Sequence, residues 1–237
     1  MFDLTRELIE NDIRKIHRLK EAISRADNII CISDNTKNDL FKLLDEKLDR
    51  VDVIHLGVSD IFRVKSTAKR PAQKRKLLFV GKRDGYKNFR NFLIAFANSS
   101  ILKKEFLIEV FGGGEFNTDE NDLIRKLGVE NFIVKTDGND MRLAESYRTS
   151  TAFIYPSLQE GFGLPIVEAM ASGCPVICSN SSSFPEVAGS AAVYFSGHST
   201  DSIQTTLESV LSSESILTEL SQKGAERSTF FSWKNAP

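Results

Sequence analysis

Short apolar runs alternate with amphipathic stretches along the chain, and this pattern predicts alternating strands and helices. In the first part, helical spacing of apolar residues marks 4–24 and 34–48, and apolar runs at 26–33 and 51–59 predict buried strands. From residue 76 onward the strands are predicted at 76–81, 106–114, 131–136, 151–157, 175–179 and 191–195. The helices between and after them are predicted at 88–102, 121–128, 142–150, 164–173, 184–190, 200–212 and 214–226. This alternation indicates an α/β fold, a Rossmann-like parallel sheet with helices on both faces.

A polar and basic stretch separates the two series of elements. It predicts a first unit at 1–58, a connector at 59–75 that contains Pro71, and a second unit at 76–237. The basic run "KRPAQKRK" (69–76) is interpreted as a solvated connector. A patch for anionic lipid is the alternative, and it would bring the protein into peripheral contact with the inner face of the membrane.

Composition and charge narrow the class of protein. Apolar residues make up 41% of the 237 positions and the formal net charge is −1, so we expect a packed core and no general attraction for nucleic acid. No apolar run is long enough for a membrane span, and the N-terminus lacks the features of a signal peptide. Cys31, Cys174 and Cys178 stand in apolar surroundings, which predicts buried reduced thiols in a cytoplasmic protein. They offer no spacing typical of a metal site.

Glycines stand where several predicted strands end. Gly81 follows one strand, Gly112, Gly113 and Gly114 follow the next, and Gly161 comes soon after a third. In parallel α/β sheets, ligands bind beyond the carboxyl ends of the strands. The glycines therefore predict a ligand site at that edge.

The stretch "PSLQEGFGLPIVEAM" (156–170) joins two acids to a glycine turn and a helix start. Glycines let a backbone approach a ligand, and Pro165 suits the first helical turn. Free N–H groups at such a helix start can hold an anion or sugar hydroxyls, while Glu160 and Glu168 supply acceptors. The residues alone leave two interpretations open. The stretch is either a helix N-terminus whose acids stabilise the helix, or a site for a polyhydroxylated ligand.

A second stretch, "VGKRDGYKNF" (80–89), places three cations on a strand-end loop. Lys82, Arg83 and Lys87 combine point-charge and fork-shaped donors ahead of a helix, which predicts an anion site; a solvated loop is the alternative. The stretch lacks the spacing of a Walker loop, "FGGGEF" is not the dinucleotide pattern, and no D-x-D motif occurs. Glu186 is interpreted as a first-turn helix acid, and His17, His55 and His198 as structural or surface residues without a partner at a telling spacing.

The motifs together resemble those of a known family. "EGFGLPIVE" resembles the E-x7-E motif of retaining glycosyltransferases of family 4 (group 1), whose GT-B fold has two facing Rossmann-like domains. The similarity continues through "GKRDGYKN", "FGGG", "YPSLQEGFGLPIVEAMASGCPVICSNSSSFPEVAG" and the closing "FSW". The variants "GYKNF", "FGGG" and "DGND" resemble most the bacterial branch rich in mannosyltransferases for O-antigen and other polysaccharides.

The resemblance implies roles for individual residues. Glu160 would contact the hydroxyls of the donor sugar, Glu168 would bind the ribose, and Arg83 with Lys87 would neutralise the diphosphate. Lys82 is the alternative to Arg83, because many relatives carry their arginine directly after the strand-end glycine. The remaining donor-binding residues would be Gly161, Phe162, Gly163 and Leu164 through their N–H groups, Gly112, Gly113, and Asp137 and Gly138 beside the nucleobase.

The resemblance also implies a reaction and a domain plan. The enzyme would transfer a hexose, with mannose favoured, from a GDP- or UDP-linked sugar to a glycan or lipid-linked acceptor, without a metal or other cofactor. Residues 1–58 would be the last two α/β units of an N-terminal acceptor domain, and 76–237 the donor domain, so we expect a chain shortened at the N-terminus and slightly at the C-terminus. The alternative is a non-catalytic sugar-nucleotide-binding remnant or subunit that needs a separate acceptor domain. A related sugar phosphorylase ranks third, because no lysine-cofactor signature is visible.

Overall fold

The computed structural model describes residues 13–63 and 75–233. Its first unit contains α2 (Ile13–Arg25), β1 (Ile29–Cys31), α3 (Asp34–Leu44) and β2 (Val51–Val53). The two short strands pair in parallel, and their core is formed by Leu19, Ile23, Cys31, Leu40 and Val51. Residues 4–12 of the predicted first helix and 64–74 of the connector, with most of "KRPAQKRK", lie outside the described residues.

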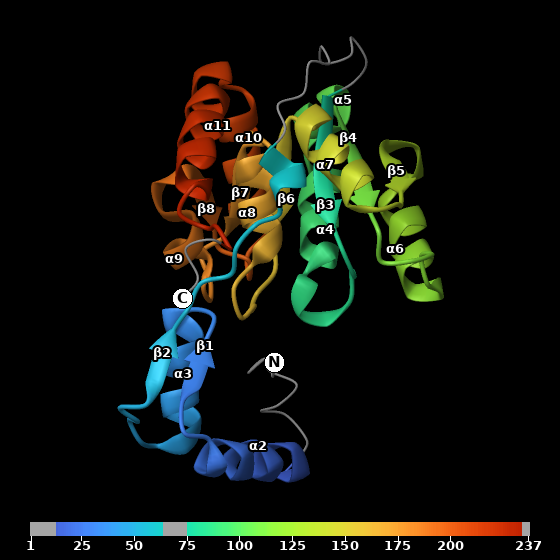
Figure 1. Cartoon of the computed structure of the whole chain (residues 1–237). Coiled ribbons are helices and arrows are strands. Elements are labelled where there is room, and N and C mark those ends of the chain that lie inside the picture. Colours follow the sequence, from blue (N-terminus) through green and yellow to red (C-terminus); the bar gives the residue numbers. More distant parts are fainter. Residues whose placement is uncertain (1–12, 64–74, 234–237) are drawn as a thin grey trace.

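The second unit is built on a six-stranded parallel sheet. Its strands are β3 (Arg75–Val80), β4 (Phe106–Phe111), β5 (Ile133–Thr136), β6 (Ala152–Tyr155), β7 (Val176–Ser179) and β8 (Ala192–Phe195). They lie in the order β5-β4-β3-β6-β7-β8, and Figure 1 shows the first unit below this sheet. The predicted fold class, a parallel sheet with helices on both faces, is confirmed.

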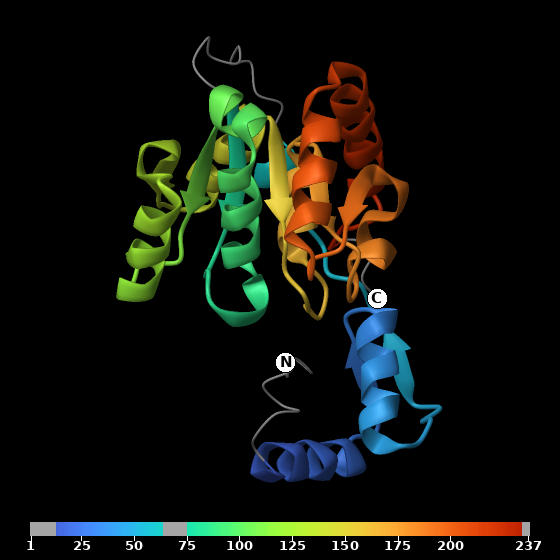
Figure 2. The same cartoon turned by 180° about the vertical axis from the view of Figure 1, so that it is seen from behind.

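Alternating side chains of the strands feed two separate cores. Leu77 and Phe79 of β3 face one core, and Leu78 between them faces the other, as the two-residue period of a strand requires. The first core is covered by α4 (Phe89–Asn98), α5 (Ser100–Glu105), α6 (Thr118–Leu127) and α10 (Thr200–Leu211), of which α4 and α10 lie in front of the sheet in Figure 2. The second core is covered by α7 (Asp140–Thr149), α8 (Leu164–Ala171) and α9 (Phe184–Ala188), while α11 (Glu214–Ser228) packs beside α8.

Several predicted elements differ in extent from the structure, and two of them have a clear physical reason. The helix expected at 88–102 is broken at Ser99, whose extended backbone ends α4 and whose hydroxyl accepts the Leu102 amide to begin α5. The apolar run 51–59 forms a strand only over Val51–Val53, because after Ile54 the chain leaves the first unit and crosses to the second. Ser99 can end the helix because a serine hydroxyl forms hydrogen bonds with nearby backbone groups that would otherwise bond within the helix. The apolar period of the sequence is unchanged by this, so the pattern did not show the break.

The strand order creates a switch point between β3 and β6. The chain runs from β3 outward through β4 to β5, and then returns to the other side of β3 to lay down β6, β7 and β8. The loops after β3 and β6 therefore leave the sheet in diverging directions, and a ligand crevice is expected between them. These are the loops that carry the two stretches singled out in the sequence.

The end of the described chain returns to the junction of the two units. The Val58 amide donates to the Phe231 carbonyl at 3.0 Å, and Arg63 of the 3-10 helix η1 (Asp60–Arg63) donates to the same carbonyl. Gly57 is so close to Trp233 that a Cβ there would lie 2.4 Å from the Trp233 amide nitrogen. Within the described ranges, we find no helix with the length and hydropathy of a membrane span.

Candidate functional site

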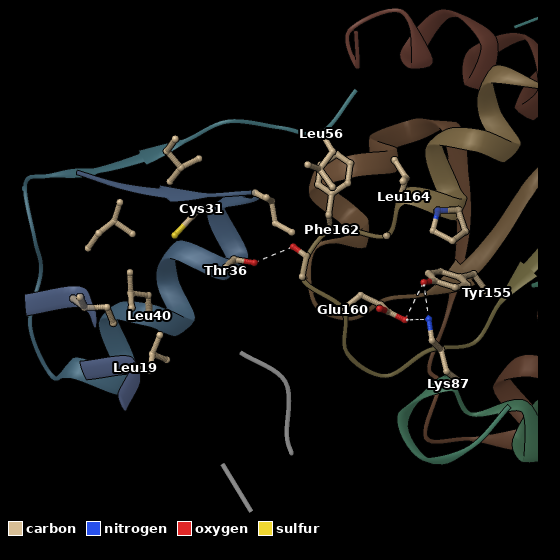
Figure 3. A pocket seen from close by; sticks show the side chains of 17 residues that line it. Leu19, Cys31, Thr36, Leu40, Leu56, Lys87, Tyr155, Glu160, Phe162 and Leu164 are labelled. Carbon is tan, nitrogen blue, oxygen red and sulfur yellow. Dashed lines mark hydrogen bonds and ion pairs between the residues drawn. The ribbon is translucent and has the colours of Figure 1, made fainter. Parts of the chain in front are cut away.

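A cavity of about 510 Å³ opens between the two units (Figure 3). One wall is apolar and comes from the first unit, including Leu19, Leu40 and Leu56. The other wall comes from the loops after β3 and β6 and includes Lys87 and Glu160. The cavity thus lies at the switch point of the sheet, where the topology places a ligand site.

Three polar side chains meet on that second wall. The Lys87 ammonium lies 2.7 Å from Glu160 Oε1, and the Tyr155 hydroxyl donates to the same oxygen at 2.9 Å (Figure 3). The side chains of Lys87 and Glu160 are 16% and 12% exposed. Burial, together with the Glu160 carboxylate, raises the pKa of Tyr155, so its phenol stays protonated and acts as a donor. The sequence predicted Lys87 and Glu160 for one site, and the structure places them in direct contact.

The loops after β3 and β6 are joined by backbone contacts. The Leu158 amide donates to the Tyr86 carbonyl at 2.8 Å. Asn88, buried in the left-handed conformation with φ 58°, donates from its side chain to the carbonyls of Pro156 and Gly197. An asparagine tolerates this backbone better than most residues, and it fixes the end of the Lys87 loop against the Glu160 loop.

The glycine turn leads directly into α8. Gly163 is the N-cap residue with φ 87°, and a Cβ there would lie 3.2 Å from the ring of Phe184, so both conformation and space favour glycine. Pro165 occupies the first turn of the helix, as predicted. In the part of the chain that the structure describes, no group accepts a hydrogen bond from the amides of Phe162 or Gly163. These amides and the helix start suit an anion or a sugar oxygen.

Glu168 lies on α8 and does not line the cavity of Figure 3. Its Oε2 accepts the hydroxyl of the fully buried Tyr147 at 3.1 Å. Burial raises the pKa of Glu168 to about 7, Tyr147 lowers it in part, and the nearby Asp140 raises it. The Glu168 carboxyl group therefore titrates near neutral pH.

Arg83 is occupied by the glycine-rich loop after β4. Its guanidinium donates to the carbonyls of Gly112, Gly113, Gly114 and Glu115, and it pairs with Glu120 at 2.8 Å. The residue is 7% exposed, and Gly113 packs so closely that a Cβ would lie 2.5 Å from an Arg83 nitrogen. The structure thus places Arg83 beneath this loop and outside the cavity lining. Lys82, the alternative named from the sequence, is exposed.

The remaining predicted residues lie at the rim of the sheet. Asp137 and Gly138 follow β5 and are exposed, and the Asp137 carboxylate accepts the Gly138 amide at 2.8 Å. Gly112 follows β4, and its amide donates to the Thr136 carbonyl at the end of β5. The loops after β4 and β5 therefore lie next to each other, and Arg83 contacts the loop after β4. Within 13–63 and 75–233, no group of three or more His, Cys, Asp or Glu side chains could hold a metal ion.

Sequence reasoning missed two tyrosines and the partner of one histidine. Tyr155 and Tyr147 each donate to one of the two predicted acids. The usable signal for Tyr155 is its position as the last residue of a buried strand at the ligand edge. His55, interpreted from the sequence as a structural or surface residue, lies 2.8 Å from Glu186 Oε1. The two residues are 131 positions apart, so sequence spacing could not reveal the pair.

Comparison with known proteins identifies the relatives of this fold and site. The family model described as glycosyl transferases group 1 matches residues 60–227. O-antigen chain mannosyltransferase B of Escherichia coli is 29% identical over 92% of this chain and 60% of its own length. O-antigen chain mannosyltransferase RfbU of Salmonella typhimurium is 26% identical over 81% of this chain and 53% of its own length. The chain therefore spans less than two thirds of these curated relatives.

Solved structures agree with the fold. Sucrose-phosphate synthase of Thermosynechococcus elongatus superposes with a TM-score of 0.84 at 20% identity, over 96% of this chain and 60% of that one. HepE of Anabaena, in complex with UDP and glucose, gives 0.85 at 14% identity, over 97% of this chain and 65% of that one. The family model covers well over half of the residues. The chain belongs to the group 1 family of glycosyl transferases.

Proposed function

We propose that this chain is the donor-binding part of a retaining glycosyltransferase. It would transfer a hexose, with mannose favoured, from a GDP- or UDP-linked sugar to a glycan or lipid-linked acceptor. The observation that carries the proposal is the Lys87–Glu160–Tyr155 contact at the switch point, beside the start of α8. The O-antigen mannosyltransferases among its relatives support mannose.

Glu160 would bind hydroxyls of the donor sugar. Its Oε1 already accepts from Lys87 and Tyr155, which leaves Oε2 as the acceptor for a ligand. A carboxylate held by two donors is oriented before the sugar arrives, so binding does not have to restrict it. The turn Gly161–Leu164 would supply amide donors next to it.

The diphosphate would lie at the start of α8 against lysines. The reaction needs stabilisation of a departing nucleoside diphosphate and of an oxocarbenium-like transition state, and preorganised donors provide this. Lys87 is preorganised by Glu160, and the exposed Lys82 is the second cation of the loop. Arg83 would act indirectly, by holding Gly112 and Gly113 in place.

The nucleoside would extend from this point. Glu168 would accept the ribose hydroxyls, since Tyr147 occupies its Oε2 and Oε1 is left to the ligand. Asp137 and Gly138 would border the nucleobase. The first unit, within the predicted 1–58, would contribute part of the acceptor side, and an acceptor domain elsewhere would complete the reaction. Peripheral contact with the membrane through 69–76 belongs to the same proposal.

A ligand titration tests the donor site directly. We expect the 237-residue chain to bind GDP-mannose or UDP-glucose, with GDP and UDP as simpler probes, by isothermal titration calorimetry. In an assembly active with an acceptor, Lys87→Ala should lower turnover by about a hundredfold, the cost of losing one preorganised charge-stabilising donor. Lys104→Ala, an exposed change at the end of α5, serves as the control.

The outcomes separate the proposal from its alternatives. A chain that binds none of the four nucleotides has no competent donor site, and the proposal fails. Binding with unchanged turnover in Lys87→Ala would remove the role of this lysine. Binding without any transfer, even when an acceptor domain from a relative is supplied, would favour the non-catalytic remnant.

A further inference from the structure

The start of α3 lies against the glycine turn of the candidate site. The Thr36 hydroxyl donates to the Gly161 carbonyl at 2.9 Å (Figure 3). The Ser33 hydroxyl donates to the same oxygen at 2.6 Å. Ser33 is fully buried and also caps α3, since it accepts the Thr36 amide at 2.9 Å. Two hydroxyls of the first unit thus converge on one carbonyl of the second.

An acid from the second unit holds α3 in this position. The Glu186 carboxylate accepts the Asp34 amide at 2.8 Å and the Asn35 amide at 3.1 Å. His55, from the segment after β2, adds a contact at 2.8 Å. A carboxylate at the N-terminus of a helix satisfies unpaired N–H groups and interacts favourably with the helix dipole. Glu186 therefore joins the start of α3 to the second unit through contacts separate from those of Ser33 and Thr36.

Ser182 secures the neighbouring residue of the turn. Its hydroxyl accepts the Glu160 amide at 3.1 Å and donates to the Glu160 carbonyl at 2.5 Å. Ser182 has φ 55°, a conformation that costs free energy for a residue with a side chain. The side chain of Asn35, in the first turn of α3, donates to the same hydroxyl at 3.4 Å. The backbone of Glu160 and Gly161 is thus held on both sides.

Peptide geometry turns this anchoring into an orientation of the turn. The structure contains no cis peptide among its described residues, so the Phe162 N–H points opposite to the Gly161 carbonyl. Because that carbonyl is directed at α3, the amide is directed away from α3. It is one of the amides that no described residue engages. Its direction is therefore set by Ser33 and Thr36 of another unit.

We propose that the start of α3 is a positioning element for the donor site: Ser33 and Thr36 aim the Phe162 amide, and Glu186 locks α3 in place. The proposal rests on the proposed function, since it assigns that amide to the sugar or diphosphate. It makes the geometry of the donor turn depend on the first unit. Loosening α3 would then weaken the donor site without any change in a donor-binding side chain.

Two substitutions at Thr36 separate the hydrogen bond from packing. Thr36→Val keeps the volume and removes the donor, whereas Thr36→Ser keeps the donor and removes a methyl group. In ¹H–¹⁵N spectra of the nucleotide-free chain, we expect Thr36→Val to move the Phe162 amide resonance and Thr36→Ser to leave it nearly in place. An unmoved Phe162 resonance in Thr36→Val would overturn the proposal.

Glu186 is tested in the same spectra. Glu186→Gln and Glu186→Ala should move the amides of Asp34 and Asn35 and also that of Phe162. Glu214→Ala, which removes an exposed acid from the first turn of α11, is the matched control and should move none of them. A change confined to Asp34 and Asn35 would mean that Glu186 only caps α3, and its locking role would be excluded.

Donor affinity gives the functional readout. With GDP-mannose or UDP-glucose, Thr36→Val should weaken binding about three- to tenfold, the usual effect of one hydrogen bond, and Thr36→Ser should restore it. A moved Phe162 resonance with unchanged affinity would overturn the link to the donor site. If the unaltered chain binds neither nucleotide, the proposed function fails, and the spectra still decide whether α3 positions the turn.

Discussion

The two acids of the candidate site are each held by a buried tyrosine hydroxyl. Tyr155 donates to Glu160 at 2.9 Å and Tyr147 donates to Glu168 at 3.1 Å. Burial, together with the neighbouring carboxylates, raises the pKa of both tyrosines well above the usual range, so each phenol stays protonated and acts as a donor at neutral pH. A fixed donor on one oxygen leaves the other oxygen of each carboxylate, Oε2 of Glu160 and Oε1 of Glu168, available as an acceptor.

Removing one hydroxyl tests this arrangement. Tyr155→Phe keeps the ring in its core and leaves Glu160 to Lys87 alone, so we expect the donor KM to rise about three- to tenfold while the fold is retained. The measurement is steady-state kinetics in an active assembly, with thermal unfolding as the check on stability. Tyr194→Phe, which removes a hydroxyl that donates to the Gly189 carbonyl, is the control. An unchanged KM would show that Tyr155 does not position Glu160.

Glu168 gives the site a pH dependence near neutrality. Its folded pKa of about 7 exceeds the ordinary value of 4.5, so the folded protein binds a proton more tightly than the unfolded chain. Stability should therefore fall by about 1 kcal/mol per pH unit as pH rises from 4.5 to 7. With Glu168 accepting the ribose hydroxyls, as proposed, donor binding should have the opposite trend, because the ionised carboxylate is the better acceptor. The donor KM should then fall as pH rises through 7. Glu168→Gln should flatten both profiles, measured by urea unfolding and kinetics; unflattened profiles would assign the effect elsewhere.

Most strands and helices of the fold could be predicted from the sequence. Apolar periodicity predicted the sheet, and glycines at strand ends predicted the ligand edge, because both depend on local residue types. The break at Ser99 follows from a hydroxyl that bonds the backbone, which an apolar pattern does not register. The hydrogen bonds of Arg83 are made to carbonyls that lie 29 to 32 positions later in the sequence, so no local pattern indicates them. Only the folded chain shows which of the two adjacent cations is buried, so the sequence singled out Lys82 and Arg83 without showing that Arg83 is buried and Lys82 exposed.

The buried Glu109 carboxylate links β4 to β3, β5 and α7. Glu109 of β4 is 2% exposed and bonds Lys76 of β3, Thr136 of β5 and Ser146 of α7. Burial alone would raise the pKa of Glu109, but Lys76 and the two hydroxyls more than offset it, so the net pKa is lowered. The ionised carboxylate therefore stabilises the fold above the ordinary pKa, and this contribution is lost as pH falls through the lowered value.

Removing the Lys76 cation should lower the stability of the fold, because the buried Glu109 carboxylate then lacks a charge partner. Lys76→Met leaves Glu109 without its charge partner, and we expect a loss of about 2 kcal/mol, less than for a fully buried pair because the Lys76 side chain is 26% exposed. Urea denaturation measures the change, with Lys104→Met as the exposed control. The double variant Lys76→Met with Glu109→Leu should recover part of the stability. A double variant no more stable than Lys76→Met would contradict this account.

The two units are held together at more than one point. On one side of the cavity, α3 meets the glycine turn and Glu186. At the junction, the segment that ends at Trp233 returns to the chain next to Gly57. A cavity between two units keeps its shape only if both contacts persist. Its geometry is therefore a property of the whole molecule, and no single element determines it.

Gly57 tests the second contact. Its φ is not in the left-handed region, so alanine is conformationally acceptable there, but the added Cβ would lie 2.4 Å from the Trp233 amide nitrogen and must displace the returning segment. We expect Gly57→Ala to cost about 2 kcal/mol by overpacking and to speed hydrogen exchange at the Val58 amide, whose partner is the Phe231 carbonyl. Ser59→Ala, an exposed change two residues on, should leave both unchanged. Weaker nucleotide binding by Gly57→Ala, with the contacts of α3 retained, would show that the junction determines the shape of the cavity. Unaltered hydrogen exchange at Val58 would show that the returning segment does not hold the two units together.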